Sequence, residues 1–121
     1  MKRLVMAIAI LAAGTAFTAS AQTAAPDPAK VAAGKKVYDA ASSKCSMCHA
    51  IAGKGNAKYP LDGIGGKMTA ADLKMWFTDP AAMEAKLKTM PAVKMSSMVG
   101  KSVKLSPADV DNLVAYMLSL K

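Results

Sequence analysis

The stretch Cys45-Ser46-Met47-Cys48-His49 has the spacing C-x-x-C-H, which is the attachment motif for c-type haem. The spacing has a physical reason. One helical turn holds two thiols so that each can add to a vinyl group of the same haem, and the histidine after the second thiol then faces the iron. The motif therefore predicts Cys45 and Cys48 as covalent attachment sites for one haem, and His49 as an axial ligand of its iron.

Other uses of these residues fit the chain less well. A zinc site needs four nitrogen or sulfur ligands, and the sequence has only two Cys and one His. A thioredoxin-like redox pair normally lies near a βαβ pattern, which is missing here; together with a structural disulfide it forms a second alternative. A copper site built from methionines would explain neither cysteine. Haem attachment remains the interpretation that uses all three residues.

The sixth iron ligand cannot be a second histidine of the same chain, because His49 is the only one. The position is then filled by Met, Lys or another weak ligand, or stays open. A thioether is soft, suits Fe(II) and raises the reduction potential. Met90, Met95 and Met98 lie in the irregular stretch 89–105, from which a loop can fold over the far face of the haem. We favour Met95, and Met98 and Met90 remain alternatives.

The first 21 residues differ from the rest of the chain. Met1-Lys2-Arg3 is basic, Leu4 to Ala13 is apolar, and Ala19-Ser20-Ala21 fits the A-x-A cleavage pattern. These features predict a signal peptide over residues 1–21, with a retained N-terminal anchor as the alternative. Because c-type attachment occurs outside the cytoplasm, we expect a periplasmic protein with no stable membrane insertion after cleavage.

The charge balance indicates which partners the protein meets. The sequence has 16 Lys+Arg against 8 Asp+Glu. Cleavage after Ala21 would leave 14 Lys against 8 acidic residues, a formal charge of +6, and no arginine. Nucleic-acid readers usually rely on arginine forks, so we expect no nucleic-acid binding. A basic surface favours a redox partner with an acidic face. The lysines expected to surround the haem are Lys54, Lys58, Lys67, Lys94 and Lys101.

Capping residues and apolar spacing predict an all-α domain over residues 27–121, after a short linker at 22–26. Four or five helices are expected and no strand. The expected helix starts are Asp27 with Pro28, Thr69, Pro80 (to about Lys88) and Ser106 with Pro107. The residues expected to face inward are Val31, Gly34, Tyr38 and Ala41, then Leu73, Trp76 and Phe77, then Val110, Leu113, Val114, Met117 and Leu120.

The loop at 50–67 is expected to support the haem. A ligating histidine usually donates its second ring N–H to an acceptor, and the Pro60 carbonyl is our candidate for His49. Gly63 and Gly65 would allow the backbone to approach the haem closely. Tyr59, Trp76 and Phe77 would pack on the haem or reach a propionate, although plain core packing explains these aromatic residues equally well.

Four segments in order resemble the small monohaem class I cytochromes c of the periplasmic bacterial type. They are Ala33–Tyr38, Cys45–His49, Pro60–Gly63 and Leu113–Met117, and the resemblance extends from about Ala32 to Leu120. It implies a compact helical fold around one covalently bound haem, with His49 and Met95 as axial ligands and the Pro60 carbonyl behind His49. It also implies that the first and last helices cross near Gly34 and Tyr116.

One departure from the family pattern concerns the sixth ligand. Many members have Pro directly after the ligand Met, whereas Ser96 follows Met95 here and Pro91 follows Met90. The resemblance implies a monomeric carrier of single electrons, which is not an enzyme and needs no catalytic residue. The alternatives are an obligate haem subunit of a larger periplasmic oxidoreductase, and a ligand-binding haem protein with an open sixth position.

Overall fold

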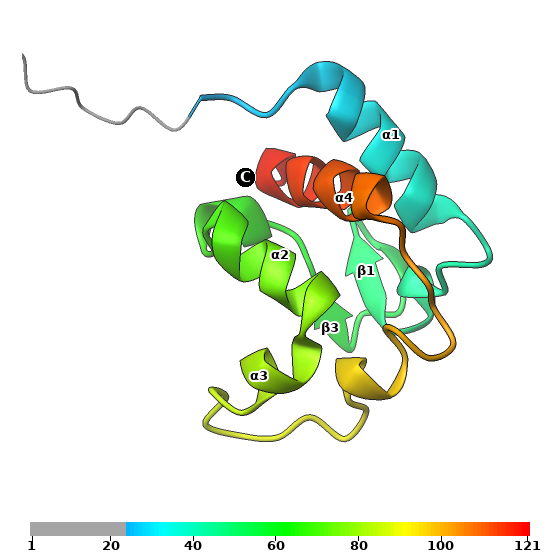
Figure 1. Cartoon of the computed structure of the whole chain (residues 1–121), viewed down its shortest axis with the longest axis vertical. Coiled ribbons are helices and arrows are strands. Elements are labelled where there is room, and N and C mark those ends of the chain that lie inside the picture. The colour runs from blue at the N-terminus through cyan, green and yellow to red at the C-terminus, as the bar shows by residue number, and fades with distance from the viewer. Residues whose placement is uncertain (1–23) are drawn as a thin grey trace, which may run out of the picture.

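The computed structural model describes residues 24–121 (Figure 1). The predicted signal peptide and the first two linker residues lie outside the described residues. The α-helices are α1 (Pro28–Asp39), α2 (Ala70–Thr78), α3 (Pro80–Glu84) and α4 (Pro107–Ser119), and the 3₁₀ helices are η1 (Cys45–Met47), η2 (Ile64–Gly66) and η3 (Met95–Ser97). The strands are β1 (His49–Ile51), β2 (Lys54–Gly55) and β3 (Tyr59–Pro60). No helix in this part of the chain is long and apolar enough to cross a membrane.

The four predicted α-helices are present, but the expectation that no strand forms is wrong. β1 pairs antiparallel with β2 and parallel with β3, giving the strand order β2-β1-β3. The chain reverses between β1 and β2 at Ala52 and Gly53, which both have positive φ. Each strand has only two or three residues, so no alternating apolar pattern marks it in the sequence.

The predicted helix starts are confirmed by their capping hydrogen bonds. The side chain of Asp27 accepts from the Ala29 N–H, and that of Thr69 accepts from the Asp72 N–H. At the start of α4, the side chains of Ser106 and Asp109 form a reciprocal capping box. Local side chains therefore determine where these helices begin.

Two predicted helix ends are wrong. The first helix ends at Asp39, so Ala41 lies outside it and is exposed. The Ser43 hydroxyl donates to the carbonyls of Tyr38 and Ala40 and so satisfies backbone groups at the end of α1. The third helix ends at Glu84 rather than near Lys88, because the N–H groups of Lys86 and Leu87 bond three residues back and tighten the chain.

The core lies where α1 and α2 pack against α4 (Figure 1). Its buried members are Tyr38, Leu73, Leu113, Tyr116 and Met117. The Tyr38 and Tyr116 rings meet edge to face, with centroids 6.0 Å apart. α1 and α4 cross at Gly34 and Tyr116 as expected: a Cβ built on Gly34 would lie 2.8 Å from the Tyr116 Cβ. Only glycine allows this approach of the two helices.

Candidate cofactor site

A cavity of about 540 Å³ lies between the core, the C-x-x-C-H motif and the stretch 89–105. Its volume lies within the range of small-molecule and cofactor sites, about 300–1,000 Å³. The wall is almost entirely apolar. The four predicted site residues Cys45, Cys48, His49 and Met95 all line it, together with Tyr59, Trp76, Phe77, Met90, Met98, Leu113 and Met117. Residues that lie up to 72 positions apart in the chain are thus brought to one cavity.

The two cysteines lie on one tight turn. Cys45 begins η1, and the Cys48 N–H bonds to the Cys45 carbonyl at 3.2 Å, as the predicted helical turn requires. Both thiols are free and half-buried. Burial raises the pKa of the Cys45 thiol, and a hydrogen bond to Ser43 opposes this only in part. A redox-active C-x-x-C pair needs the opposite, a thiol with a lowered pKa.

The His49 ring is held by the backbone of the neighbouring strand. Its Nδ1 donates to the Tyr59 carbonyl at 2.8 Å, because a carbonyl can only accept. This places the ring proton on Nδ1 and leaves Nε2 free to bind a metal. The expectation of a Pro60 acceptor is therefore wrong by one residue. The register of β1 with β3 pairs His49 with Tyr59. The sequence does not predict these strands, so it could not predict this pairing.

A second contact fixes the backbone of His49 from the side of the core. The Tyr38 hydroxyl of α1 donates to the His49 carbonyl at 3.1 Å. Burial raises the pKa of Tyr38 to about 12, so this hydroxyl keeps its proton at neutral pH. Tyr38 was expected to face inward on the first helix, but its link from α1 to the motif was not predicted.

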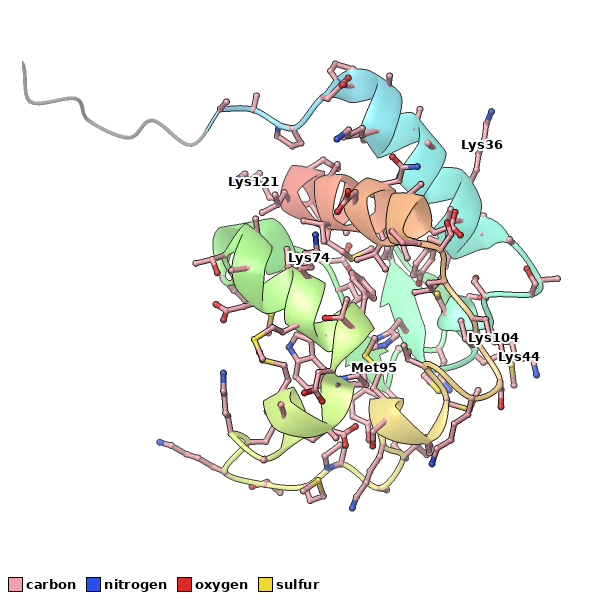
Figure 2. All side chains as sticks on the ribbon, viewed as in Figure 1. Lys36, Lys44, Lys74, Met95, Lys104 and Lys121 are labelled. Atoms are coloured by element: carbon pink, nitrogen blue, oxygen red, sulfur yellow. The ribbon has the colours of Figure 1, made fainter. Side chains whose placement is uncertain are left out.

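The three candidate methionines all line the cavity, with different burial. Met90 is 49% exposed, whereas Met95 and Met98 are half-buried. Met95 begins η3, and Figure 2 shows it toward the middle of the molecule. The Met98 carbonyl accepts from the N–H groups of the turn that leads to Val103. Of these three candidates, Met95 and Met98 therefore have the less exposed thioethers.

One polar atom of the cavity wall has no hydrogen-bond partner. The indole nitrogen of Trp76 is buried, and within residues 24–121 nothing accepts its hydrogen. Buried indole N–H groups usually have an acceptor. A haem brings carboxylate propionates, two vinyl groups for the free thiols, and an iron for the free His49 nitrogen. The residues present therefore fit this group, and Tyr59 and Phe77 line the same cavity as expected.

The expected roles of two glycines are corrected. A Cβ built on Gly65 would lie 2.4 Å from the Leu118 carbonyl, and the Gly65 N–H donates to the Leu120 carbonyl at 2.8 Å. Gly65 thus allows close contact with the end of α4 rather than with the cofactor. Gly63 has φ +72° and no atom within 4 Å of a built Cβ, so it serves the turn before η2.

The expected ring of lysines is also corrected. Of the five lysines expected around the haem, only Lys94 lines the cavity. Lys44, which the sequence analysis does not single out, lies at the same wall directly before Cys45 and has φ 55°. Lys54 and Lys58 are close to the motif in the sequence, but the loop at 52–58 carries them away from the cavity wall. The sequence does not predict the path of this loop.

Glu84 is a further cavity residue that the sequence analysis misses. It is 4% exposed, and its carboxylate bonds to Ser96. Nothing in the sequence marks it, because a charged residue in a short helix is expected on the solvent side. Within residues 24–121, no group of three or more His, Cys, Asp or Glu side chains is arranged so that it could hold a metal ion.

The chain matches a known protein family. The model of the family described as Cytochrome c matches residues 31–121, which include the motif, the cavity and all four α-helices except the first turn of α1. No curated protein and no solved structure matches the chain.

Proposed function

The chain belongs to the cytochrome c family, and on this basis we propose that it is a periplasmic carrier of single electrons with a His49/Met95-ligated haem. The family implies a covalently bound c-type haem with iron and haem-based electron transfer. The observation that carries the finer proposal is the meeting of free thiols, a free His49 nitrogen and a half-buried methionine at one apolar cavity. When bound, the haem supplies the one-electron Fe(II)/Fe(III) couple.

The C-x-x-C-H motif supplies the residues that would hold the haem. Cys45 and Cys48 would form the thioether bonds, and His49 would present Nε2 to the iron. The Tyr59 carbonyl fixes the ring tautomer and the Tyr38 hydroxyl fixes the backbone of the same residue. Two elements distant in the chain thus keep His49 in one orientation, which a carrier needs in both oxidation states.

Two features support a positive reduction potential. The cavity is apolar, and an apolar surrounding disfavours the additional charge of oxidised iron. A methionine thioether as sixth ligand acts in the same direction. Trp76 would satisfy its indole N–H with a propionate and so anchor the buried edge of the group. None of these residues needs to bind or release a substrate.

The lysine surface supports docking on an acidic redox partner. Lys44 and Lys94 lie at the cavity wall with exposed side chains, and the sequence has twice as many basic as acidic residues. Attraction between opposite faces accelerates encounter without requiring a large interface. A free monomeric carrier would use this surface to dock on its redox partner. An obligate subunit would instead purify with a catalytic chain.

The visible absorption spectrum tests the proposal. We expect a c-type haem spectrum in the oxidised and reduced protein, with the weak Fe(III)–thioether band at the red end of the visible range. Met95→Ala should abolish that band, whereas Met98→Ala and Met90→Ala should keep it. A haem spectrum that lacks the band and shifts on addition of CO would replace the carrier with a ligand-binding protein. Loss of the band only in Met98→Ala would transfer the ligand role to Met98.

A further inference from the structure

Glu84 is the only charged side chain that the structure buries within residues 24–121, and the proposed function leaves it without a role. Glu84 forms no ion pair: those in this part of the chain join Lys35 to Asp39 and Lys74 to Asp111, and the charge of Lys94 acts on Glu84 only as a minor influence. A buried carboxylate is unfavourable unless hydrogen bonds replace its hydration. The groups that donate hydrogen bonds to the Glu84 carboxylate therefore indicate its role.

Both carboxylate oxygens of Glu84 bond to one residue. The Ser96 N–H donates to Oε1 at 2.9 Å, and the Ser96 hydroxyl donates to Oε2 at 2.6 Å. These bonds lower the pKa of Glu84, the hydroxyl contributing most, so the group is a carboxylate at neutral pH. Hydrogen bonds to an ionised acceptor are about twice as strong as neutral ones. Glu84 therefore binds Ser96 at two points.

Ser96 is the residue that follows Met95 in η3. No side chain caps the start of η3 within its own segment, and residues 85–90 and 92–94 before it are exposed. The α3–η3 packing, to which the Glu84–Ser96 bonds belong, connects η3 to the helix that precedes this exposed stretch. Glu84 and Met95 line the same cavity.

We propose that Glu84 is a positioning residue for the sixth iron ligand: its carboxylate holds the Ser96 backbone and hydroxyl, and thereby keeps Met95 at the cavity wall. The inference rests on the proposed function, in which Met95 is that ligand. It also gives Ser96 a role. A proline at this position would have neither an N–H nor a hydroxyl to donate to Glu84.

Competition by imidazole for the oxidised iron measures how firmly Met95 is held. Imidazole can bind only when the thioether leaves, so weaker positioning appears as tighter imidazole binding, followed by loss of the Fe(III)–thioether band. We expect Glu84→Ala to raise the imidazole affinity by about tenfold or more, because the variant loses hydrogen bonds that a charged group makes to Ser96. Ser96→Ala should act in the same direction with a smaller effect, because the backbone N–H bond remains.

Two further variants separate geometry from charge. Glu84→Gln keeps an acceptor for the Ser96 N–H but loses the charge, so its imidazole affinity should lie between wild type and Glu84→Ala. The double variant Glu84→Ala/Ser96→Ala should bind imidazole no more tightly than Glu84→Ala, because both changes remove the same interaction. Additive effects of the two single changes would contradict the proposed contact.

The chain offers a matched control at the start of α4. Asp109 accepts from the Ser106 N–H at 3.0 Å and from the Ser106 hydroxyl at 2.8 Å, which is the same bonding pattern away from the cavity. Asp109→Ala should weaken the helix start yet leave the imidazole affinity within about twofold of wild type. If Glu84→Ala and Ser96→Ala behave like Asp109→Ala, whether all unchanged or all raised equally, the inference is overturned.

The same experiment recognises a failure of the proposed function. If the wild type lacks the Fe(III)–thioether band, or Met95→Ala retains it, Met95 is not the ligand and both the ligand assignment and this inference fall. If the band is present and depends on Met95, but imidazole affinity does not respond to Glu84, only the inference falls.

Discussion

The backbone of Gly34 in α1 lies directly against the Asn112 carbonyl in α4: a Cβ built on Gly34 would be 2.0 Å from that oxygen. The contact determines how closely the two helices that carry Tyr38 and Tyr116 approach one another. It lies outside the cavity, yet Tyr38 connects it to the motif through the His49 carbonyl. Packing of the terminal helices and orientation of the candidate iron ligand are therefore coupled.

Gly34→Ala should lower the free energy of unfolding by about 3 kcal/mol, because the new methyl group meets backbone, which cannot move aside as a side chain would. Denaturant titration followed by far-UV circular dichroism measures this. Gly66→Ala is the control: a Cβ there meets nothing within 4 Å and its φ is not positive, so its stability should stay near wild type. Equal effects of the two substitutions would contradict the crossing described above.

Removal of haem attachment should leave the chain largely unfolded. The cavity of about 540 Å³ separates η3 and α3 from the buried cluster where α1, α2 and α4 meet, and an empty apolar cavity of this size is strongly destabilising. Cys45→Ala/Cys48→Ala should lose helical circular dichroism and any cooperative thermal transition. Met47→Ala changes the 62% exposed residue between the thiols and should retain both haem and fold. A cooperative transition in the haem-free double variant would refute this prediction.

Ionic strength should slow electron transfer to an acidic partner, because salt screens the attraction that steers encounter. Lys44→Glu places a negative charge at the cavity wall and should lower the second-order rate constant several-fold at low salt. Lys36→Glu makes the same charge change on the outer side of α1 (Figure 2) and should have a smaller effect. Stopped-flow measurements over a salt series compare them. If the rate constants of the two variants depend on salt concentration in the same way, the lysines serve only to keep the protein soluble.

Tyr38 should make stability fall at high pH. Burial raises its pKa in the folded protein to about 12, above an ordinary value of 10.0. The contribution of Tyr38 is therefore complete below about pH 10 and is lost progressively between about pH 10 and pH 12, as the unfolded chain loses the proton first. Tyr38→Phe should be about 1 kcal/mol less stable at pH 8, where it lacks the bond to His49. The difference between the two proteins should shrink above pH 10; a constant difference would show that the phenol does not titrate in this way.

The sequence predicts well those parts of the fold that depend on interactions between residues close in the chain. Caps at Asp27, Thr69 and Ser106 act within three residues of the groups they satisfy, so the helix starts are predicted correctly. Helix ends are predicted less well, since Ser43 ends α1 from beyond the helix itself. The strands are missed because their pairing joins residues across loops and their length leaves no periodic pattern.

For the candidate site, the chemical groups were predictable and their supports were not. The spacing of Cys45, Cys48 and His49 predicts their shared use, because one turn and one following residue place them together without help from the rest of the chain. The stretch 89–105 is recognised as the source of a methionine, but its path around the cavity is not. The acceptor behind His49 is one residue away from the prediction because it depends on the register of β1 and β3.

The sequence by itself thus determines the haem motif and the helix starts, since each is decided by residues close in the chain. The crossing of the terminal helices at Gly34 was expected only from the family resemblance. Only the tertiary structure decides that Tyr59 rather than Pro60 supports His49, that Gly65 meets α4, and that Glu84 turns inward to Ser96. These contacts join segments 10 to 53 residues apart. Their formation depends on how loops return to the core, which is determined by packing of the whole chain and not by local preference.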